Sequence, residues 1–167
     1  MKHKAIFLDR DGIINMERGE YTWKPKDFTF VDGLIPALQL FVKNAYRLVV
    51  VSNQSGIGKG VYTYSDVEKL HSRILDTMHA NGIEIDEIYY CPHHPDTGRC
   101  ICRKPDSLLI EKALARFEID PERSFFIGDR ERDILAAEKV QVKGILVPSN
   151  TPLTGVAGQI ISNVHSN

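Results

Sequence analysis

The sequence predicts an α/β protein, a three-layer sandwich in which helices cover both faces of a central, mostly parallel sheet. Short apolar runs alternate along the chain with segments of helical periodicity, which is typical of βαβ units. These runs are unbroken, as expected for strands buried on both faces. Four of them lead directly into polar residues, as at the ligand-binding edge of a Rossmann-like sheet.

The length of 167 residues suits one domain with its own core, so residues 1–167 are interpreted as a single domain. The predicted strands are Ala5–Leu8, Leu48–Ser52, Glu87–Tyr90, Ser124–Ile127 and Gly144–Val147. The segment from Ser149 onward is polar and weakly patterned, and no element is predicted there.

Two helices are predicted in the first half of the chain. The first begins after Gly33, where apolar residues recur at helical spacing. The second opens with a capping box formed by Ser65 and Glu68 and ends at Asn81-Gly82. The predicted buried faces are Leu34, Leu38, Phe41 and Val42 in the first helix and Val67, Leu70, Ile74 and Met78 in the second.

Two further helices are predicted in the second half. Pro105 is expected to start the third, because proline is favoured in the first turn of a helix. The fourth is predicted over Glu131–Val140. The predicted apolar side of the third helix is Leu109, Ile110, Ala113, Leu114 and Phe117.

Composition and charge argue against several classes of protein. The chain is 43% hydrophobic and 26% charged, as in soluble globular proteins. Its net charge of -1 gives no nucleic-acid footprint. No apolar run approaches the roughly 20 residues of a membrane span, and Ala5–Leu8 is too short for a signal peptide. We expect a cytoplasmic protein with no nucleic-acid or membrane partner, and a monomer.

Acidic residues follow two of the predicted strands. Asp9 and Asp11 come after the first, where Gly12 lets the backbone turn sharply. Asp129 follows the fourth, whereas Asp133 is explained by the positive end of the helix that begins there. Taken alone, the first pair also fits an ordinary turn. Carboxylates from two strand ends are nevertheless the hard oxygen ligands that Mg²⁺ requires.

All three cysteines lie between positions 91 and 102, in the pattern Cys-x-His followed by Cys-x-Cys. Three cysteines are too few for a disulfide scaffold. Three thiolates and one imidazole complete a tetrahedral Zn²⁺ site that is structural in type, because no position remains for water. Reduced cysteines beside a chance histidine are the alternative. The predicted zinc-binding loop is 91–104, with ligands Cys91, His93, Cys100 and Cys102.

The order and spacing of the motifs resemble the haloacid dehalogenase superfamily phosphatases. The matching segments are Asp9-Arg10-Asp11-Gly12, Ser52, Lys104 and Gly128-Asp129, and the resemblance spans positions 5 to 147. Each motif is short and weak alone, and the specificity lies in finding all four in order. One position departs from the pattern, since the superfamily commonly has Thr where this chain has Ile13.

The resemblance implies a role for each motif. Asp9 would be the nucleophile that forms an aspartyl-phosphate intermediate. Asp11 would protonate the leaving group and then accept a proton from water. Mg²⁺ would be held by Asp9, the backbone carbonyl of Asp11, and Asp129. Ser52 and Lys104 would hold the phosphoryl oxygens in the transition state.

The Cys-Pro-His-His-Pro segment and the following Cys-x-Cys-Arg-Lys-Pro resemble a narrower group, the small, capless D-glycero-D-manno-heptose 1,7-bisphosphate phosphatases and related histidinol-phosphate phosphatases. In this group the zinc loop replaces a large cap domain. The Tyr-Tyr-Cys-Pro-His-His-Pro run favours heptose bisphosphate as the substrate, and we expect removal of its 7-phosphate. The short zinc-loop spacer and Gly128-Asp129-Arg130 favour histidinol phosphate. The implied substrate contacts are Glu17, Arg18, Gly19, Glu20, Ser52, Asn53, Gln54, Ser55, Arg103, Lys104 and Arg130.

Two other functions remain as alternatives. A non-catalytic, zinc-stabilised binding module would have no need of both aspartates, Lys104 and Asp129. A phosphotransferase would share the aspartyl-phosphate intermediate and differ only in the acceptor.

Overall fold

A computed structural model of the chain describes residues 1–165. Its five strands form one parallel sheet in the order β3-β2-β1-β4-β5. Their bounds are Lys4–Leu8 for β1, Tyr46–Asn53 for β2, Glu87–Cys91 for β3, Phe125–Gly128 for β4 and Lys143–Leu146 for β5. The five predicted strands are therefore confirmed to within two residues. Because β1 lies between β2 and β4, the polar segments after these three strands meet at the centre of one sheet edge.

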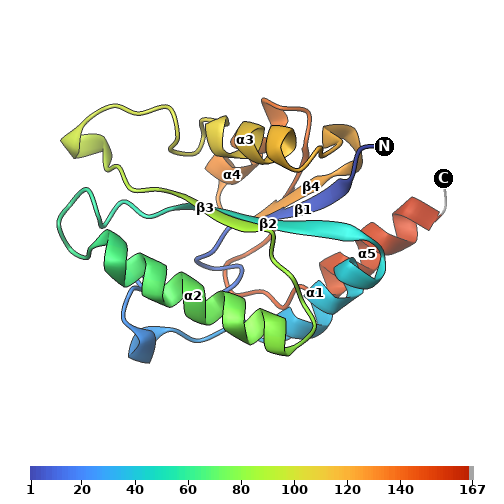
Figure 1. Ribbon diagram of the computed structural model, residues 1–167, viewed down its shortest axis with the longest axis horizontal. Coiled ribbons are helices and arrows are strands. Elements are labelled where there is room, and N and C mark those ends of the chain that lie inside the picture. Colours follow the sequence, from blue (N-terminus) through green and yellow to red (C-terminus); the bar gives the residue numbers. More distant parts are fainter. Residues whose placement is uncertain (166–167) are drawn as a thin grey trace.

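Helices cover both faces of this sheet, so the predicted three-layer α/β architecture is confirmed (Figure 1). One face carries α1, α2 and α5, and the other carries α3 and α4. The helices span Leu34–Lys43 (α1), Tyr64–Ala80 (α2), Leu108–Arg116 (α3), Glu131–Glu138 (α4) and Thr154–His165 (α5), and short 3₁₀ helices span Pro25–Asp27, Pro95–Thr97 and Pro121–Arg123. Within residues 1–165, no helix has the length and apolar character needed to cross a membrane.

The central strand β1 is buried on both faces. Ile6 and Leu8 pack into the core layer beneath α1, α2 and α5, whereas Ala5 and Phe7 pack into the layer beneath α3 and α4. Phe7 also stacks on Phe126 of β4, with ring centroids 6.2 Å apart. Burying each large apolar side chain contributes roughly 1.5–3 kcal/mol to stability. The strand that ends at the first aspartate is thus held firmly on both sides.

The start of α2 differs from the prediction. Thr63, not Ser65, is the N-cap residue, and its capping partner is Asp66, not Glu68. The Thr63 hydroxyl accepts from the Asp66 amide at 3.2 Å, and Asp66 accepts from the Thr63 amide at 2.9 Å. Both pairs fit the sequence pattern of a capping box. Only Thr63 has the extended backbone that a cap requires, since Ser65 already lies within the helix.

Helix α3 also starts later than expected. Pro105 does not open it, because the helix begins at Leu108, with Ser107 at the N-cap position. In α1, Val42 is 37% exposed, so the prediction that it lies on the buried face is wrong.

Two predictions near the C-terminus need correction. Helix α4 ends at Glu138, two residues before the predicted end. Helix α5 occupies most of the segment in which no element was predicted. Its contacts come from Ala157 and Ile160, which are buried in the same core layer as α1. Glycines at positions 155 and 158 weaken the apolar periodicity, so packing rather than local sequence defines this helix.

The capping assignment can be tested by substitution. Thr63→Ala should lower the free energy of unfolding by about 1 kcal/mol, because it removes one of the two reciprocal cap bonds. Ser65→Ala is the matched control, exposed like Thr63, and should change stability by less than about 0.5 kcal/mol. Urea unfolding of both variants measures the difference. Equal losses would return the cap to the position expected from sequence.

Candidate active site

The polar segments at the carboxyl edge of the sheet surround a cavity of about 490 Å³, a size that suits a small ligand. Its lining residues are Asp9, Asp11, Glu17, Gly19, Glu20, Tyr21, Thr22, Asn53, Gln54, Ser55, Tyr62, Arg103, Asp129, Arg130 and Arg132. Most of the residues expected to contact substrate or Mg²⁺ are in this set. Ser52 and Lys104 are buried beside it and touch its wall. Arg18 does not line the cavity and lies 3.7 Å from both Glu20 and Asp27.

Asp9, at the end of β1, is paired with a buried lysine. Lys104 Nζ lies 2.9 Å from Oδ1 of Asp9 and donates to the carbonyl of Val51 at 2.7 Å. Burial raises the pKa of Asp9 to about 7, the Lys104 charge opposes this rise, and the nearby Asp133 carboxylate adds to it. A further positive charge beside Asp9 would therefore favour its ionised, nucleophilic form.

Lys104 has a second acidic partner, Asp133, whose Oδ1 lies 2.7 Å from Nζ. Burial alone would lower the pKa of Lys104, but the two carboxylates raise it, so the ammonium stays charged. Asp133 also has the helix-terminal role expected of it, because Oδ2 accepts the Arg130 amide at 3.1 Å. A Cβ on Gly128 would come within 2.4 Å of Asp133, so glycine permits this packing. The ion pair itself was missed, since no local pattern relates positions 104 and 133.

Asp129 follows β4 and its side chain is 1% exposed. The hydroxyl of Ser149 donates to Oδ2, whereas the buried Oδ1 has no hydrogen-bond partner among residues 1–165. A Cβ on Gly12 would lie 2.2 Å from Oδ2, and Gly12 has a φ of +86°. Glycine at this position therefore lets the loop after β1 approach the second carboxylate, as its sequence context suggested.

The acidic cluster fits a hard divalent cation. Carboxylate oxygens of Asp9, Asp129 and Asp133 lie within 4.8 Å of one another, and the unpartnered Oδ1 of Asp129 supplies a free ligand atom. Oxygen donors of this kind suit Mg²⁺. The carboxylate of Asp11 is not part of this cluster, so only its main chain is left for the metal role implied by the resemblance.

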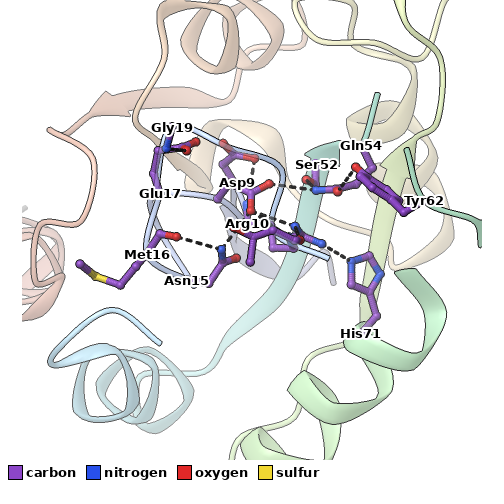
Figure 2. A network of polar contacts seen from close by, with 12 residues as sticks. Asp9, Arg10, Asn15, Met16, Glu17, Gly19, Ser52, Gln54, Tyr62 and His71 are labelled. Carbon is purple, nitrogen blue, oxygen red and sulfur yellow. Dashed lines mark hydrogen bonds and ion pairs between the residues drawn. The ribbon is translucent and has the colours of Figure 1, made fainter. Parts of the chain in front are cut away.

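The Asp11 carboxylate instead belongs to a polar network around Arg10, of which Figure 2 labels Arg10, Asn15 and His71. Arg10 Nη2 lies 2.9 Å from Oδ1 of Asp11 and donates to the carbonyl of Thr22 at 2.6 Å. Asn15 donates to the same Oδ1 at 3.0 Å. On the far side of the guanidinium, Arg10 Nη1 lies 3.3 Å from Nε2 of His71 on α2. Arg10 thus links Asp11 to α2, a helix that was not expected to contribute to the site.

The network fixes the charge states of its members. Burial alone would raise the pKa of Asp11, but the Arg10 charge and hydrogen bonds from Asn15, Arg10 and Gln54 lower it below its usual value. Burial and the Arg10 charge lower the pKa of His71 to about 3. The His71 ring is therefore neutral at physiological pH, and Nε2 accepts a hydrogen bond from Arg10.

Gln54 joins Asp11 to Ser52. Its Nε2 donates to Oδ2 of Asp11 at 3.0 Å and to the hydroxyl of Ser52 at 2.8 Å. Its Oε1 accepts from the Tyr62 hydroxyl at 2.8 Å (Figure 2). Gln54 was expected to contact substrate, and it does line the cavity, but its amide already has these three partners. Tyr62 was not predicted, because it lies in a loop without a recognisable motif.

Asn53 has a structural task at the same edge. Its amide oxygen accepts from the Lys104 main-chain amide at 3.0 Å, and its Nδ2 donates to the Lys104 carbonyl at 3.2 Å. Nearby, the Gly58 amide donates to the Pro92 carbonyl at 2.9 Å. The loop after β2 is thereby tied to both ends of the cysteine-containing loop, and the lysine is held at the site through its backbone.

Three arginines contribute to the cavity wall: Arg103, Arg130 and Arg132. Buried Nη1 of Arg103 and Nε of Arg132 have no hydrogen-bond partner in the part of the chain described. Arg132 was not predicted, although it lies only three residues after Asp129. Because a buried donor without a partner is costly, these groups are placed to receive an anionic ligand.

The four predicted zinc ligands meet in the loop after β3. Their donor atoms lie within 4.8 Å of one another. Sγ of Cys91 is 3.7 Å from Sγ of Cys100, and Nδ1 of His93 is 3.2 Å from Sγ of Cys102. Sulfur ligands of one Zn²⁺ ion, each about 2.3 Å from the metal, would lie about 3.8 Å apart. Sγ of Cys102 lies closer to Sγ of Cys91, at 3.0 Å. The donor set has the chemistry of a tetrahedral zinc site, with its donor atoms gathered around one point.

Comparisons with known proteins agree with this geometry. A family model described as HAD-hydrolase-like matches residues 101–156. The chain is 42% identical to the D-glycero-beta-D-manno-heptose-1,7-bisphosphate 7-phosphatase of Helicobacter pylori, covering 90% of this chain and 86% of that protein. It is 40% identical to the D-glycero-alpha-D-manno-heptose-1,7-bisphosphate 7-phosphatase of Campylobacter jejuni, covering 88% and 83%.

A solved structure is also similar over almost the whole chain. The D,D-heptose 1,7-bisphosphate phosphatase of B. bronchiseptica, determined with magnesium and phosphate, has a TM-score of 0.86 and 26% sequence identity. The match covers 96% of this chain and 99% of that one. Taken with the order of the four motifs, these likenesses mean that the chain belongs to the haloacid dehalogenase-like hydrolases, as a phosphatase of the group that includes the heptose-1,7-bisphosphate 7-phosphatases.

Proposed function

We propose that this phosphatase removes the 7-phosphate of D-glycero-D-manno-heptose 1,7-bisphosphate, with Asp9 as the nucleophile. The observation that carries the proposal is the buried Asp9–Lys104 pair in the wall of a cavity that also contains three arginines. The relatives with about 40% identity over most of the chain are named for this reaction. The sugar bisphosphate offers one phosphate to Asp9 and a second phosphate to the arginines.

The reaction would proceed in two steps, transfer of the phosphoryl group to Asp9 and its hydrolysis. A carboxylate oxygen of Asp9 attacks phosphorus, the bond from phosphorus to the sugar oxygen breaks, and Asp11 gives its proton to that oxygen. Water then attacks the aspartyl phosphate, Asp11 accepts the proton, and inorganic phosphate leaves with Asp9 restored. A bound phosphate dianion would oppose the influence of Arg10 and favour the protonated Asp11 that the first step needs.

Ser52 and Lys104 would stabilise the phosphoryl group during both steps. Lys104 is charged and already lies 2.9 Å from the nucleophile, so its ammonium is oriented before substrate arrives. Asp9, Asp129 and the main-chain carbonyl of Asp11 would hold Mg²⁺. When bound, that ion supplies positive charge that reduces the repulsion between the carboxylate nucleophile and the anionic phosphate.

We further propose that Cys91, His93, Cys100 and Cys102 hold a structural Zn²⁺ ion. Burial raises the pKa of the Cys91 thiol, so a metal ion would be needed to keep it as a thiolate at neutral pH. Lys104 follows the last ligand by two residues. A metal at this point would therefore fix the segment that carries Arg103 and the buried lysine.

The nucleophile assignment predicts that Asp9→Asn lowers kcat by roughly 10³-fold or more, because an amide cannot form the phospho-enzyme. Phosphate release in the presence of Mg²⁺ measures the effect. Thermal unfolding of the variant provides the control for folding. Substantial turnover in a folded Asp9→Asn protein would rule out Asp9 as the nucleophile.

The substrate assignment is tested with heptose 1,7-bisphosphate, as both anomers, and histidinol phosphate side by side. We expect kcat/KM for the bisphosphate to be higher by about a hundredfold, or about 2.7 kcal/mol, because only this substrate places a second phosphate near the arginines. A preference for histidinol phosphate would reverse the assignment. Transfer of the phosphoryl group to an added sugar would replace the hydrolase by a phosphotransferase.

The zinc assignment predicts one zinc per chain by elemental analysis, and its loss in a Cys100→Ser variant. Loss of the Cys100 thiolate should also lower the thermal unfolding midpoint, because metal binding energy contributes to folding of the loop. Asp9→Asn is the matched control, since it alters the other metal site and should retain the zinc. A purified, fully active protein without zinc would contradict the proposal.

A further inference from the structure

Tyr62 donates a hydrogen bond within the site, yet none of the steps above uses it. We propose that Tyr62 is a positioning residue, which fixes the amide of Gln54 so that a single NH₂ group orients both Asp11 and Ser52. The inference rests on the proposed function, because it concerns the same phosphoryl-transfer site. It assigns Gln54 a different task from the substrate contact expected from sequence.

The three hydrogen bonds of Gln54 form a closed set. Tyr62 donates to Oε1 at 2.8 Å, and Nε2 donates to Asp11 at 3.0 Å and to Ser52 at 2.8 Å. Gln54 is 2% exposed and Tyr62 is 5% exposed. Water therefore has little access to the Gln54 amide and the Tyr62 hydroxyl, so the amide depends on its protein partners.

Asp11 and Tyr62 together fix the direction of the amide. The oxygen and the NH₂ group of a glutamine side chain have nearly the same size, so shape alone does not distinguish two orientations related by a half-turn. In the reversed orientation, the amide oxygen would face the Asp11 carboxylate, which is electrostatically unfavourable, and its NH₂ would face Tyr62. Burial raises the pKa of Tyr62 to about 12, so its hydroxyl keeps its proton and holds the amide oxygen in the observed orientation.

This orientation prepares two reacting groups at once. The Ser52 oxygen accepts from Gln54, which leaves its own O–H free to donate to a phosphoryl oxygen. Asp11 Oδ1 is occupied by Arg10 and Asn15, whereas in the described chain Oδ2 accepts from Gln54 alone. Oδ2 thus retains a lone pair for the transferred proton, and the hydrogen bond from Gln54 fixes the orientation of the Asp11 carboxylate.

The Tyr62 ring is held independently of its hydroxyl. A Cβ on Gly56 would lie 2.1 Å from the ring, so glycine makes room for it. Tyr21 packs edge-on at 5.7 Å and Trp23 stacks at 6.0 Å between centroids. Phenylalanine can therefore occupy the same space, and Tyr62→Phe removes only the hydroxyl group.

A double-mutant cycle tests the proposal. Tyr62→Phe should lower kcat/KM for the sugar bisphosphate by about three- to tenfold, the effect of one neutral hydrogen bond. In a Gln54→Met background, which removes the amide at similar side-chain volume, the same substitution should have no further effect. Gln54→Ala serves as a second background, and thermal unfolding verifies that each variant is folded.

Tyr46→Phe is the matched control. Its hydroxyl is buried and has no hydrogen-bond partner in residues 1–165, and it lies at the opposite end of β2 from Ser52. This variant should keep the activity of the unaltered enzyme. Unchanged kcat/KM in the Tyr62→Phe enzyme would overturn the proposal, because the tyrosine would then be unimportant. An equal loss with and without the Gln54→Met substitution would also overturn it, because the tyrosine would then act independently of Gln54.

A second readout separates orientation of Asp11 from general damage. An aryl ester with a weakly basic leaving group, such as p-nitrophenyl phosphate, needs no proton from Asp11 to depart. Tyr62→Phe should therefore lower kcat/KM less for this ester than for the sugar ester, and equal losses would overturn the assignment to Asp11. Absence of turnover of any monoester by the unaltered enzyme would instead refute the proposed function, and this inference with it.

Discussion

The ammonium of Lys104, enclosed by Asp9 and Asp133, is the interaction on which the rest of the site depends. The lysine side chain is 1% exposed, and a charge so far from water is tolerated only when it is well paired. Its partners come from the end of β1 and from the first turn of α4, while the lysine follows the cysteine-containing loop. One ion-pair network therefore joins three segments that are distant in sequence.

The charges of this network do not cancel. One ammonium faces Asp9 and Asp133, and the carboxylate of Asp129 lies within the same cluster. The excess of negative charge and the unpartnered oxygen of Asp129 explain why the site suits a divalent cation. A cation would also favour ionisation of Asp9, which burial opposes. The proposed Mg²⁺ binding and the proposed activation of Asp9 would thus be two consequences of one arrangement of charges.

Asp11, only two residues from Asp9, belongs to a different environment. Its carboxylate turns away from the metal cluster toward Arg10 and Gln54, which connect it to His71 and Tyr62. One aspartate is thereby placed among charges suited to nucleophilic attack, and the other among hydrogen bonds suited to proton transfer. The different roles proposed for the two carboxylates would arise from their neighbours, since the two side chains are chemically identical.

The strands, most helix faces and the four motifs of the candidate site could be predicted from the sequence, because these features are encoded in contiguous residues. An unbroken apolar run such as that of β1 indicates a buried strand, and Gly12 indicates a turn after it. The cap of α2 was assigned to Ser65 instead of Thr63, because both positions fit the pattern of a capping box. Helix α5 was not predicted, because its glycines obscure the apolar periodicity. The ion pair of Lys104 with Asp133 and the hydrogen bond from Tyr62 to Gln54 could not be predicted, because they arise only in the folded chain. Such contacts depend on strand order and on how loops pack across the sheet edge, which no local pattern records.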